Sequence, residues 1–288
     1  MSVVVNDLDI GDVVGNTRML LGRVKRRKKK NGGEFLEIYF SDKTGTIEGR
    51  KWENTDLNHV QEGEVVRVNG KVVPYKGSSQ LKVYSISEVD QEKVDYTQYV
   101  EKINGDPKLF YQTLKQFGSN IKSSAVSKFY KYCLNKHEKK FIKWPAASSN
   151  HHAKVGGLVK HICSMMCLAQ KTTNHYKQLY DDYEGFDRDV VDMGILLHDF
   201  FKIETIESPI TRSKSDKAKK IGHIGLALEH LAKYKGELDG KYEAIQHVVA
   251  SHHGKKEWGS PVEPQTPEAK LVHRLDMMDS RMDKVFNK

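Results

Sequence analysis

The stretch Asp192-Met-Gly-Ile-Leu-Leu-His198-Asp199-Phe-Phe-Lys202 decides the fold of the second half of this 288-residue chain. Four of the six residues before the His198-Asp199 pair are apolar, which is typical of a buried helix. Such a helix would carry two adjacent metal-ligand side chains to the edge of a core, where unpaired polar groups are unfavourable. The pair therefore requires partners from elsewhere in the chain.

Histidines supply these partners. Eleven of the thirteen histidines lie between His151 and His273. A single histidine on an apolar helix face is more often a packing residue, but an ordered set with aspartates indicates a metal site. His175, His230, His247 and His273 belong to no such set, and we assign them to surface or packing roles. The candidate ligands, in chain order, are His161, His198, Asp199, His223, His252, His253 and Asp276.

This order of His, His-Asp, His, His-His and Asp closely resembles the HD-domain metal-dependent phosphohydrolases. The resemblance implies two sets of ligands, with Asp199 as a bridge between them. The first set is His161, His198, Asp199 and Asp276, and the second is His223, His252 and His253. Imidazoles with one or two carboxylates suit transition metals better than Ca²⁺. We expect two divalent ions, with manganese preferred and iron, cobalt or zinc as alternatives.

Asp199, Lys202 and His152 are the candidate catalytic residues. Lys202 lies three residues after Asp199, so on a continuous helix its ammonium would share the same face and reach a phosphate oxygen. Many HD enzymes have a Lys at this spacing, but they usually have Gly where this chain has Phe201, a side chain that could narrow the site or change how the helix ends. His152 is a candidate to contact phosphate or to protonate the leaving oxygen, against a structural turn.

Two further stretches lie beside these motifs. The basic run Thr211-Arg-Ser-Lys-Ser-Asp-Lys-Ala-Lys-Lys220 is loop-like, and such a run is usually a solvated loop. Guidance of a nucleic-acid strand by Arg212 and Lys214 is the alternative. Residues 254–267 hold three prolines and Trp258 and are predicted to form a stiff rim of the cleft.

The first half reads as short strands separated by turn residues from about Thr17 to Val89. About five strands in so short a segment fit a small closed barrel, and the pattern resembles an OB-fold of the nucleic-acid-binding type. The predicted strands cover about residues 19–24, 35–40, 46–52, 63–70 and 80–86.

In such barrels a loop can grip the nucleic-acid backbone while exposed aromatic rings stack on bases. We expect the basic run of residues 25–30 to form that loop, although it could be only a solvated hairpin tip. Because alternate strand positions face the core, about half of the candidate aromatic residues should be buried. The candidates are Arg26, Arg27 and Lys28 for phosphates, and Phe35, Tyr39, Trp52 and Tyr75 for stacking.

The segments Trp144-Pro-Ala-Ala-Ser-Ser-Asn-His-His152 and Gly156-Gly-Leu-Val-Lys-His161 look like the start of the HD domain in the YhaM-type 3′-5′ exoribonucleases. Those proteins also carry an N-terminal OB-fold. The predicted fold class is therefore multidomain α+β, with a five-stranded barrel (1–90), a linker with packing helices (91–140) and an all-α HD domain (141–288). The resemblance implies a metal-dependent exonuclease that shortens single-stranded RNA, and also single-stranded DNA, from the 3′ end.

Composition agrees with an anionic partner, because the net charge is +9 and the isoelectric point is near 9.2. Three cysteines do not form a disulfide framework, so a cytoplasmic location is expected. We see no signal peptide and no apolar run of the roughly 20 residues that span a membrane. Homo-oligomerisation stays open.

Two rival functions fit the same motifs. The first is a phosphohydrolase of nucleotides or cyclic nucleotides, with the barrel as a regulator. The second is a nucleic-acid-binding protein that keeps only a structural metal site, an interpretation that Phe201 favours. The complete ligand set argues against it, because a structural site rarely needs seven ligands.

Overall fold

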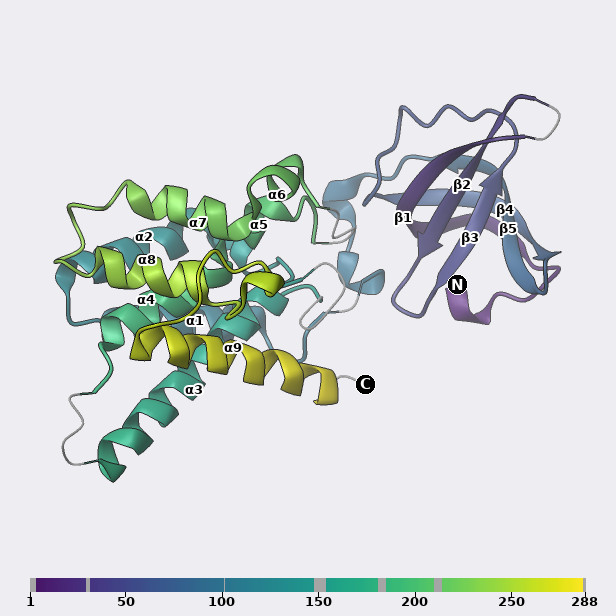
Figure 1. The fold of residues 1–288 in the computed structure, drawn as a ribbon. Coiled ribbons are helices and arrows are strands. Elements are labelled where there is room, and N and C mark those ends of the chain that lie inside the picture. The colour runs from purple at the N-terminus through teal and green to yellow at the C-terminus, as the bar shows by residue number, and fades with distance from the viewer. Residues whose placement is uncertain are drawn as a thin grey trace. The chain divides into compact units, whose positions relative to one another are not determined.

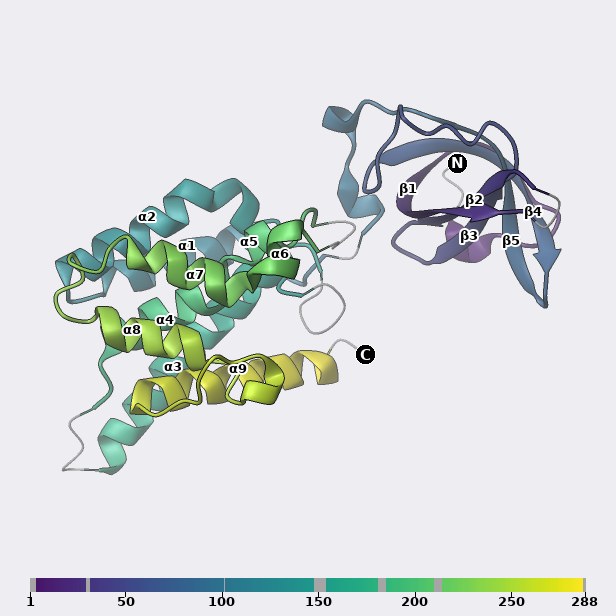
Figure 2. The same ribbon diagram turned by 45° about the horizontal axis from the view of Figure 1, so that its top comes forward.

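The chain divides in its computed structural model into two compact units, Met1–Glu101 and Lys102–Lys288. The structure describes residues 4–29, 32–100, 102–147, 154–180, 185–209 and 214–286. Each unit has its own hydrophobic core, and no described residue belongs to both cores. The two units are drawn from two directions in Figures 1 and 2 and are described here one at a time.

The first unit is a closed barrel with the strand order β1-β2-β3-β5-β4, which confirms the predicted five-stranded architecture. Among the described strands, β3 and β5 pair in parallel and the other neighbours pair antiparallel. The first strand is long enough to pair with β4 and then with β2, and its register shifts between Leu21 and Val24. Such a bulge bends the strand and lets the sheet close. The strands are β1 (Val13–Lys28), β2 (Glu34–Ser41), β3 (Thr46–Lys51), β4 (Val65–Tyr75) and β5 (Ser78–Ser87).

Alternation along the strands separates the core of the barrel from its outer surface. Leu36, Ile38 and Phe40 of β2 are buried, whereas the alternate residues Phe35, Glu37 and Tyr39 are only half-buried. This period of two is the pattern expected of a strand with one face in the core.

The polar stretch that follows the barrel packs on it, although we expected a linker from residue 91 onward. The side chain of Gln91 donates to the carbonyl of Val65 at 2.8 Å and accepts from its amide at 3.0 Å. The hydroxyl of Tyr96 donates to the same Gln91 side chain at 2.6 Å. The two short 3-10 helices, η2 (Gln91–Lys93) and η3 (Tyr96–Gln98), thus lie within the barrel unit.

The second unit is all helical (Figure 1). Asp106 caps its first helix by accepting from the amide of Lys108, with Pro107 at the first helical position. The helices are α1 (Pro107–Ser119), α2 (Ser124–Phe141), α3 (Gly157–Leu179), α4 (Arg188–Phe200), α5 (Lys202–Thr205), α6 (Asp216–Lys220), α7 (Gly222–Ala232), α8 (Tyr242–Ser251), the 3-10 turn η4 (Lys256–Trp258) and α9 (Pro267–Phe286).

Helix α4 is the centre of this unit, and every residue from Asp189 to Phe200 is buried. It contacts α2, α3, α7, α8 and α9, and it lies among the other helices in both views (Figures 1 and 2). Gly194 permits close packing on α8, since a Cβ there would overlap the side chain of Val248. The deciding stretch of sequence is therefore a buried helix, as its apolar pattern predicts.

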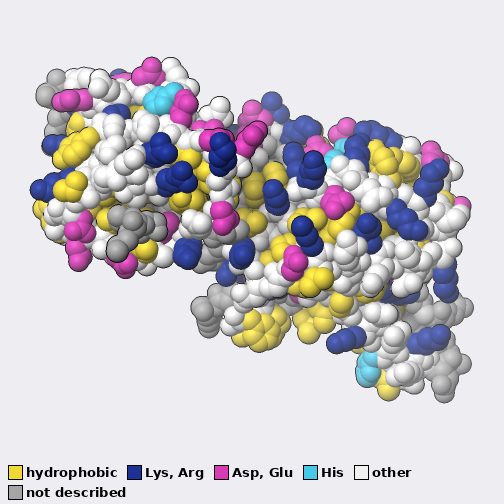
Figure 3. Space-filling view, turned by 180° about the vertical axis from the view of Figure 1, so that it is seen from behind, with side chains coloured by type: hydrophobic (Ala, Val, Ile, Leu, Met, Phe, Trp, Pro, Cys, Tyr) yellow, Lys and Arg dark blue, Asp and Glu magenta, His cyan; other side chains and the backbone are white. Residues whose placement is uncertain are grey.

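The positive net charge is spread rather than concentrated on the face shown in Figure 3, where Lys and Arg side chains alternate with Asp and Glu over each unit. Within the ranges that the structure describes, no helix is long and apolar enough to cross a membrane.

Candidate metal centre

The C-terminal end of α4 delivers His198 and Asp199 to the edge of the helical core. His198 is fully buried, and its Nδ1 donates to the carbonyl of Ile195 at 2.7 Å. His252, just beyond α8, has the same arrangement with the carbonyl of Val249 at 2.8 Å. A carbonyl can only accept, so in each neutral ring the Nε2 carries the free lone pair that a metal ion needs.

The first cluster joins three helices. His161 of α3 places its Nε2 3.3 Å from the Nε2 of His198 and 3.4 Å from the Oδ1 of Asp276 on α9. One ligand atom from each of these three residues lies within 4.8 Å of the others, a spacing that could hold a metal ion. The structure thus brings together three of the ligands predicted for the first ion.

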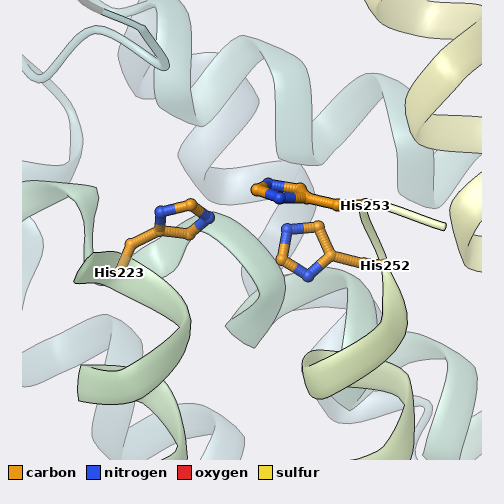
Figure 4. Close-up of side chains that lie close together, drawn as sticks. All are labelled: His223, His252 and His253. Carbon is orange, nitrogen blue, oxygen red and sulfur yellow. The ribbon is translucent and has the colours of Figure 1, made fainter. Parts of the chain in front are cut away.

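The second cluster is formed by His223 at the start of α7 and by His252 and His253 after α8 (Figure 4). Their ligand atoms also lie within 4.8 Å of one another. Among the described residues, the buried atoms His223 Nε2, His252 Nε2 and His253 Nδ1 have no hydrogen-bond partner. Buried unpaired nitrogens are unfavourable, and a bound cation would satisfy all three. The donor set therefore fits a metal ion.

Asp199 lies between the two clusters, and each of its carboxylate oxygens faces one of them. Its Oδ2 is 3.6 Å from His198 Nε2 and 3.8 Å from His161 Nε2. Its Oδ1 is 3.4 Å from His223 Nε2 and 3.9 Å from His252 Nε2. This is the arrangement expected of a carboxylate that bridges two ions.

The electrostatics of the second cluster favour neutral imidazoles. Burial lowers the pKa of His223 to about 3 and lowers the pKa of His252 well below its ordinary value. The pKa of His198 is lowered for the same reason. Burial would raise the pKa of Asp199, but Lys202 and the surrounding imidazoles lower it well below its usual range. Neutral rings around an ionised carboxylate are the protonation states that bind metal.

His161 differs from the other histidines because two carboxylates contact it. Burial would lower its pKa, but hydrogen bonds to Asp276 and Asp279 outweigh burial and raise the pKa to about 10. Its Nδ1 lies 2.7 Å from Asp279 Oδ2, and Ser164 donates to the other oxygen of Asp279. Metal ligation needs the neutral ring, so a bound cation and the His161 proton compete.

Asp279 and Ser164 were not among the residues proposed from sequence. The signal was present, because Ser164 follows His161 by three residues and Asp279 follows Asp276 by three, and residues at this spacing share a helix face. A carboxylate behind a ligating histidine orients the ring and raises its basicity.

Lys202 lies at the site, but the helix does not continue to it. Helix α4 ends at Phe200, and α5 begins at Lys202. The Nζ of Lys202 contacts Asp199 Oδ2 at 2.5 Å, so the predicted proximity of the two charges holds without a continuous helix.

Phe201 packs against His230. Its side chain is buried and stacks on the ring of His230 with 4.3 Å between the ring centroids. The backbone φ of Phe201 is −77°, a value that needs no glycine. The side chain is not among the residues that line the cleft, so it does not narrow the site.

A cleft of about 600 Å³ opens onto the centre. The residues that line it include Asp199, Lys202, His252, His253 and Asp276. His273, a residue for which the sequence predicts a surface or packing role, also lines the cleft, and its Nδ1 donates to the carbonyl of His252 at 2.8 Å. A larger hollow of about 970 Å³ lies between α2 and α5–α6, but none of the described ligand candidates lines it. The candidate ligands Asp199, His252, His253 and Asp276 line the smaller cleft instead.

The basic run before His223 is only partly described. His152 and Arg212 lie outside the described residues. Lys214 is exposed and is not among the residues that line the cleft. The expected loop ends earlier than predicted, because Asp216–Lys220 forms α6 with Ser215 as its N-cap.

On the barrel, the predicted basic loop is strand. The first strand continues through Lys28, and Arg27 pairs with Phe35 across the β1–β2 ladder. Arg27 forms an ion pair with Glu37 at 3.3 Å. Arg26 instead contacts Glu34 at 3.3 Å and the backbone of Thr55 at 3.4 Å. Both arginines are thus partly engaged by the protein itself, and only Arg27 shares a face with Phe35.

The aromatic side chains of the barrel gather on its outer surface. Phe35 and Trp52 stack with centroids 4.5 Å apart. The guanidinium of Arg50 lies 5.5 Å from the ring centroid of Phe35 and 4.1 Å from that of Tyr75. We call Phe35, Arg50, Trp52 and Tyr75 the aromatic face.

Tyr39 is half-buried on the same strand as Phe35, and its hydroxyl lies 3.4 Å from Glu37. We expected about half of the four aromatic candidates to be buried, but none of them is in the core. The inward positions of β2 are taken by the aliphatic residues and Phe40 instead.

Comparison with known proteins agrees with both units. Residues 158–281 match the family model of the HD domain, and residues 19–89 match that of the OB-fold nucleic acid binding domain. A solved structure, the second OB-fold domain of replication protein A from Methanococcus maripaludis, is 20% identical and covers 31% of this chain and 96% of that domain. Its TM-score of 0.26 is too low to support any conclusion.

A relative of known function matches most of the chain. The 3′-5′ exoribonuclease YhaM of Bacillus subtilis (strain 168) is 33% identical over 259 residues, which cover 88% of this chain and 80% of the relative. The order of the two matched domains is the order of the two units described above. The chain belongs to the family of the 3′-5′ exoribonuclease YhaM.

Proposed function

We propose that this protein is a metal-dependent 3′-5′ exoribonuclease that shortens single-stranded RNA, and also single-stranded DNA. The observation that carries the proposal is the position of Asp199, whose two oxygens face two separate groups of ligands. Its membership of the YhaM family supports the reaction and the polarity.

The ligand set supports two divalent ions, with manganese preferred and iron, cobalt or zinc as alternatives. His161, His198 and Asp276 would hold one ion, His223, His252 and His253 the other, and Asp199 would contact both. When bound, such a pair offsets the negative charge of a phosphodiester and lowers the pKa of a coordinated water.

The remaining residues of the chain position and neutralise the substrate. Lys202 lines the cleft beside Asp199, so its ammonium is available to a phosphate oxygen that enters there. His152 is proposed to protonate the leaving oxygen. The aromatic face of the barrel would hold the unpaired strand by stacking, and Arg27, which pairs with Phe35 across the β1–β2 ladder, would add positive charge.

The three cysteines form no disulfide bond in the described residues, and this supports the proposal that the protein acts in the reducing environment of the cytoplasm.

A gel time course with 5′-labelled single-stranded RNA tests the proposal. Chelator-stripped protein is assayed with and without Mn²⁺, beside the His198→Ala, Asp199→Ala double variant. A descending ladder that requires metal and vanishes in the double variant is the expected result. His175→Ala is the matched control, because His175 is exposed on the same helix as His161 and should retain full activity.

Other outcomes would change the assignment. If the RNA stays intact with every metal tested but the protein still retards it in a native gel, the exonuclease hypothesis is wrong. Such a result would favour a nucleic-acid-binding protein. Hydrolysis of nucleotides or cyclic nucleotides without any ladder would favour the phosphohydrolase. A parallel lane with single-stranded DNA shows whether the enzyme requires the ribose 2′-hydroxyl of its substrate.

A further inference from the structure

Three side chains that line the metal cleft are not candidate metal ligands, and we call them the wall of the cleft. Trp258, Arg281 and Lys284 line the same cleft of about 600 Å³ as Asp199 and Asp276. They come from two different elements, the loop after His253 and the C-terminal half of α9. Their composition, one indole and two cations, is that of a site for unpaired nucleic acid.

Helix α9 turns one face toward the cleft. Asp276, Ser280 and Lys284 follow one another at intervals of four, and Arg281 lies beside them, so all share that face. With a rise of about 1.5 Å per residue, Arg281 and Lys284 lie about 8 Å and about 12 Å along the helix from Asp276. The face is thus acidic at the metal centre and basic further out, which suits phosphates that lead away from the centre.

Both cations point to solvent rather than to a carboxylate. Arg281 is exposed, and so is Lys284. In the part of the chain that the structure describes, neither of them forms an ion pair with a carboxylate. Both charges are therefore available to an anionic ligand.

Trp258 is held in place although it is exposed. Half of its surface is accessible (49%), and its ring lies 6.3 Å from the buried ring of His273. The loop is tied to α8, because the buried hydroxyl of Ser260 donates to the carbonyl of Ala250 at 3.1 Å. Gly259 ends the turn with a φ of 91°, a conformation that glycine adopts without strain. An exposed indole on an anchored loop is a surface on which a base can stack.

We propose that this wall is the subsite for the 3′ end of the strand, in which Trp258 stacks on the terminal base while Arg281 and Lys284 bind the phosphates that precede it. The proposal rests on the proposed function, because it names the part of the substrate that the cleft holds. It makes the cleft selective for an unpaired end, since a base within a duplex cannot offer its face to an indole.

A titration that needs no turnover tests the subsite directly. Tryptophan fluorescence of the metal-free, full-length protein is followed as the dinucleotide pApA is added. Because Trp52 belongs to the aromatic face of the barrel, the titration compares Trp52→Phe, in which we expect quenching, with the Trp52→Phe, Trp258→Phe variant, in which we expect none. Quenching that survives in the double variant, or none in Trp52→Phe, would overturn the proposal.

Kinetics separate the base from the phosphates. On RNA whose 3′-terminal nucleotide is abasic, kcat/KM of the wild type should fall about tenfold, whereas Trp258→Ala should be equally slow on both substrates. The Arg281→Ala, Lys284→Ala variant should reduce the slope of log(kcat/KM) against log[salt] by about 1.4, or roughly 0.7 for each phosphate that the variant no longer neutralises.

The matched control is Lys270→Ala, Arg274→Ala, which removes the same charge from α9 outside the cleft and should keep the wild-type slope. An unchanged slope in the Arg281, Lys284 variant, or an equal change in the control, would refute the role of the two cations. If the wild type does not shorten RNA at all, the proposed function fails, and the dinucleotide titration still decides the subsite.

Discussion

Asp199 is the residue that links the two histidine clusters. Each of its oxygens faces one cluster, and Lys202 contacts the oxygen that faces His161 and His198. A substitution here would act on both clusters together, so it cannot distinguish one ion from the other. A substitution at Asp279 can distinguish the two ions, because the candidate ligand that Asp279 contacts is His161, which belongs to the first cluster.

We predict that Asp279→Asn weakens the binding of one metal ion by roughly ten- to a hundredfold, since a carboxylate behind a ligating histidine fixes the ring and raises its basicity. Isothermal titration of the stripped protein with Mn²⁺ measures both the affinity and the number of sites. The second site should keep its affinity.

Asp216→Asn is the control for this prediction, because Asp216 is 81% exposed and pairs with Lys219 on α6, outside the cleft. Equal affinities for the wild type and Asp279→Asn would show that the Asp279 carboxylate does not support the ligand. A loss of both sites would indicate general damage to the fold.

At the residue level, the sequence predicted the candidate ligands but not the residues that hydrogen-bond to them. The order of the motifs predicted His161, His198, His223 and Asp276 because ligands must come from several helices, and these four meet in the two clusters. Asp279 was missed because a supporting carboxylate resembles any other helix surface residue. The sequence also could not show whether the side chain of Phe201 narrows the site, because only the structure shows that its ring packs against His230.

At the scale of the elements, α4 determines where the centre lies. It is buried along its whole length, and its contact with α8 aligns His198 with His252, whose rings are 5.0 Å apart. Gly194 sets that helix spacing, because any side chain there would meet Val248. The periodicity of the sequence predicted the helix, but the need for glycine follows only from the neighbour.

We predict that Gly194→Val lowers the free energy of unfolding of the helical unit by about 1–3 kcal/mol through overpacking. Adding Val248→Ala should restore part of the stability, because it removes the overlapping methyl groups, and a double-mutant cycle measures this coupling. Urea unfolding followed by circular dichroism at 222 nm reports on the helices.

Gly236→Val serves as the comparison for that cycle, since nothing lies within 4 Å of a Cβ at Gly236. Additive effects of Gly194→Val and Val248→Ala would mean that the two helices relax apart without strain.

The strands of the barrel display their aromatic residues on one surface by alternation. Phe35 of β2 stacks on Trp52, just after β3, and Arg50 of β3 lies over Phe35. The sequence predicted the aromatic candidates but not Arg50, because a lone arginine on a strand gives no sign of the ring across from it. It also misplaced the basic run, since β1 continues through Lys28 to pair with Glu34.

We predict that Phe35→Ala weakens binding of single-stranded RNA about tenfold, by removal of one stacking surface. Fluorescence anisotropy with a labelled oligonucleotide, in the absence of metal, measures the affinity. Tyr176→Ala, which truncates an exposed aromatic ring on α3, should bind as the wild type does. If Phe35→Ala and the wild type bind the oligonucleotide with the same affinity, the aromatic face is not part of the RNA-binding surface.

At the scale of the whole molecule, the two units have separate cores, and each closes without residues from the other. The sequence showed this division through the change from a period of two to helical spacing. It did not predict that the stretch after the barrel packs on it, because the bonds from Gln91 to Val65 join positions far apart in the chain and leave no local pattern.

We predict that a protein lacking residues 1–101 still hydrolyses bis-(p-nitrophenyl) phosphate with Mn²⁺, because all seven ligand candidates lie in the helical unit. Its kcat/KM on long single-stranded RNA should fall about tenfold or more, since the barrel no longer holds the strand. Release of p-nitrophenol and the gel assay measure the two activities. Unaltered kcat/KM on RNA would favour a regulatory barrel.

The hydrogen bonds from His198 and His252 to carbonyls of their own helices have one more consequence. Because these bonds hold both rings from inside the protein, the binding geometry is preorganised before any ion arrives. Metal uptake then needs little rearrangement of the chain, unlike in small zinc domains that fold only with their metal. Loading should behave as a reversible exchange equilibrium that follows the supply of divalent ions, and the supply of ions could thereby set the rate of RNA decay.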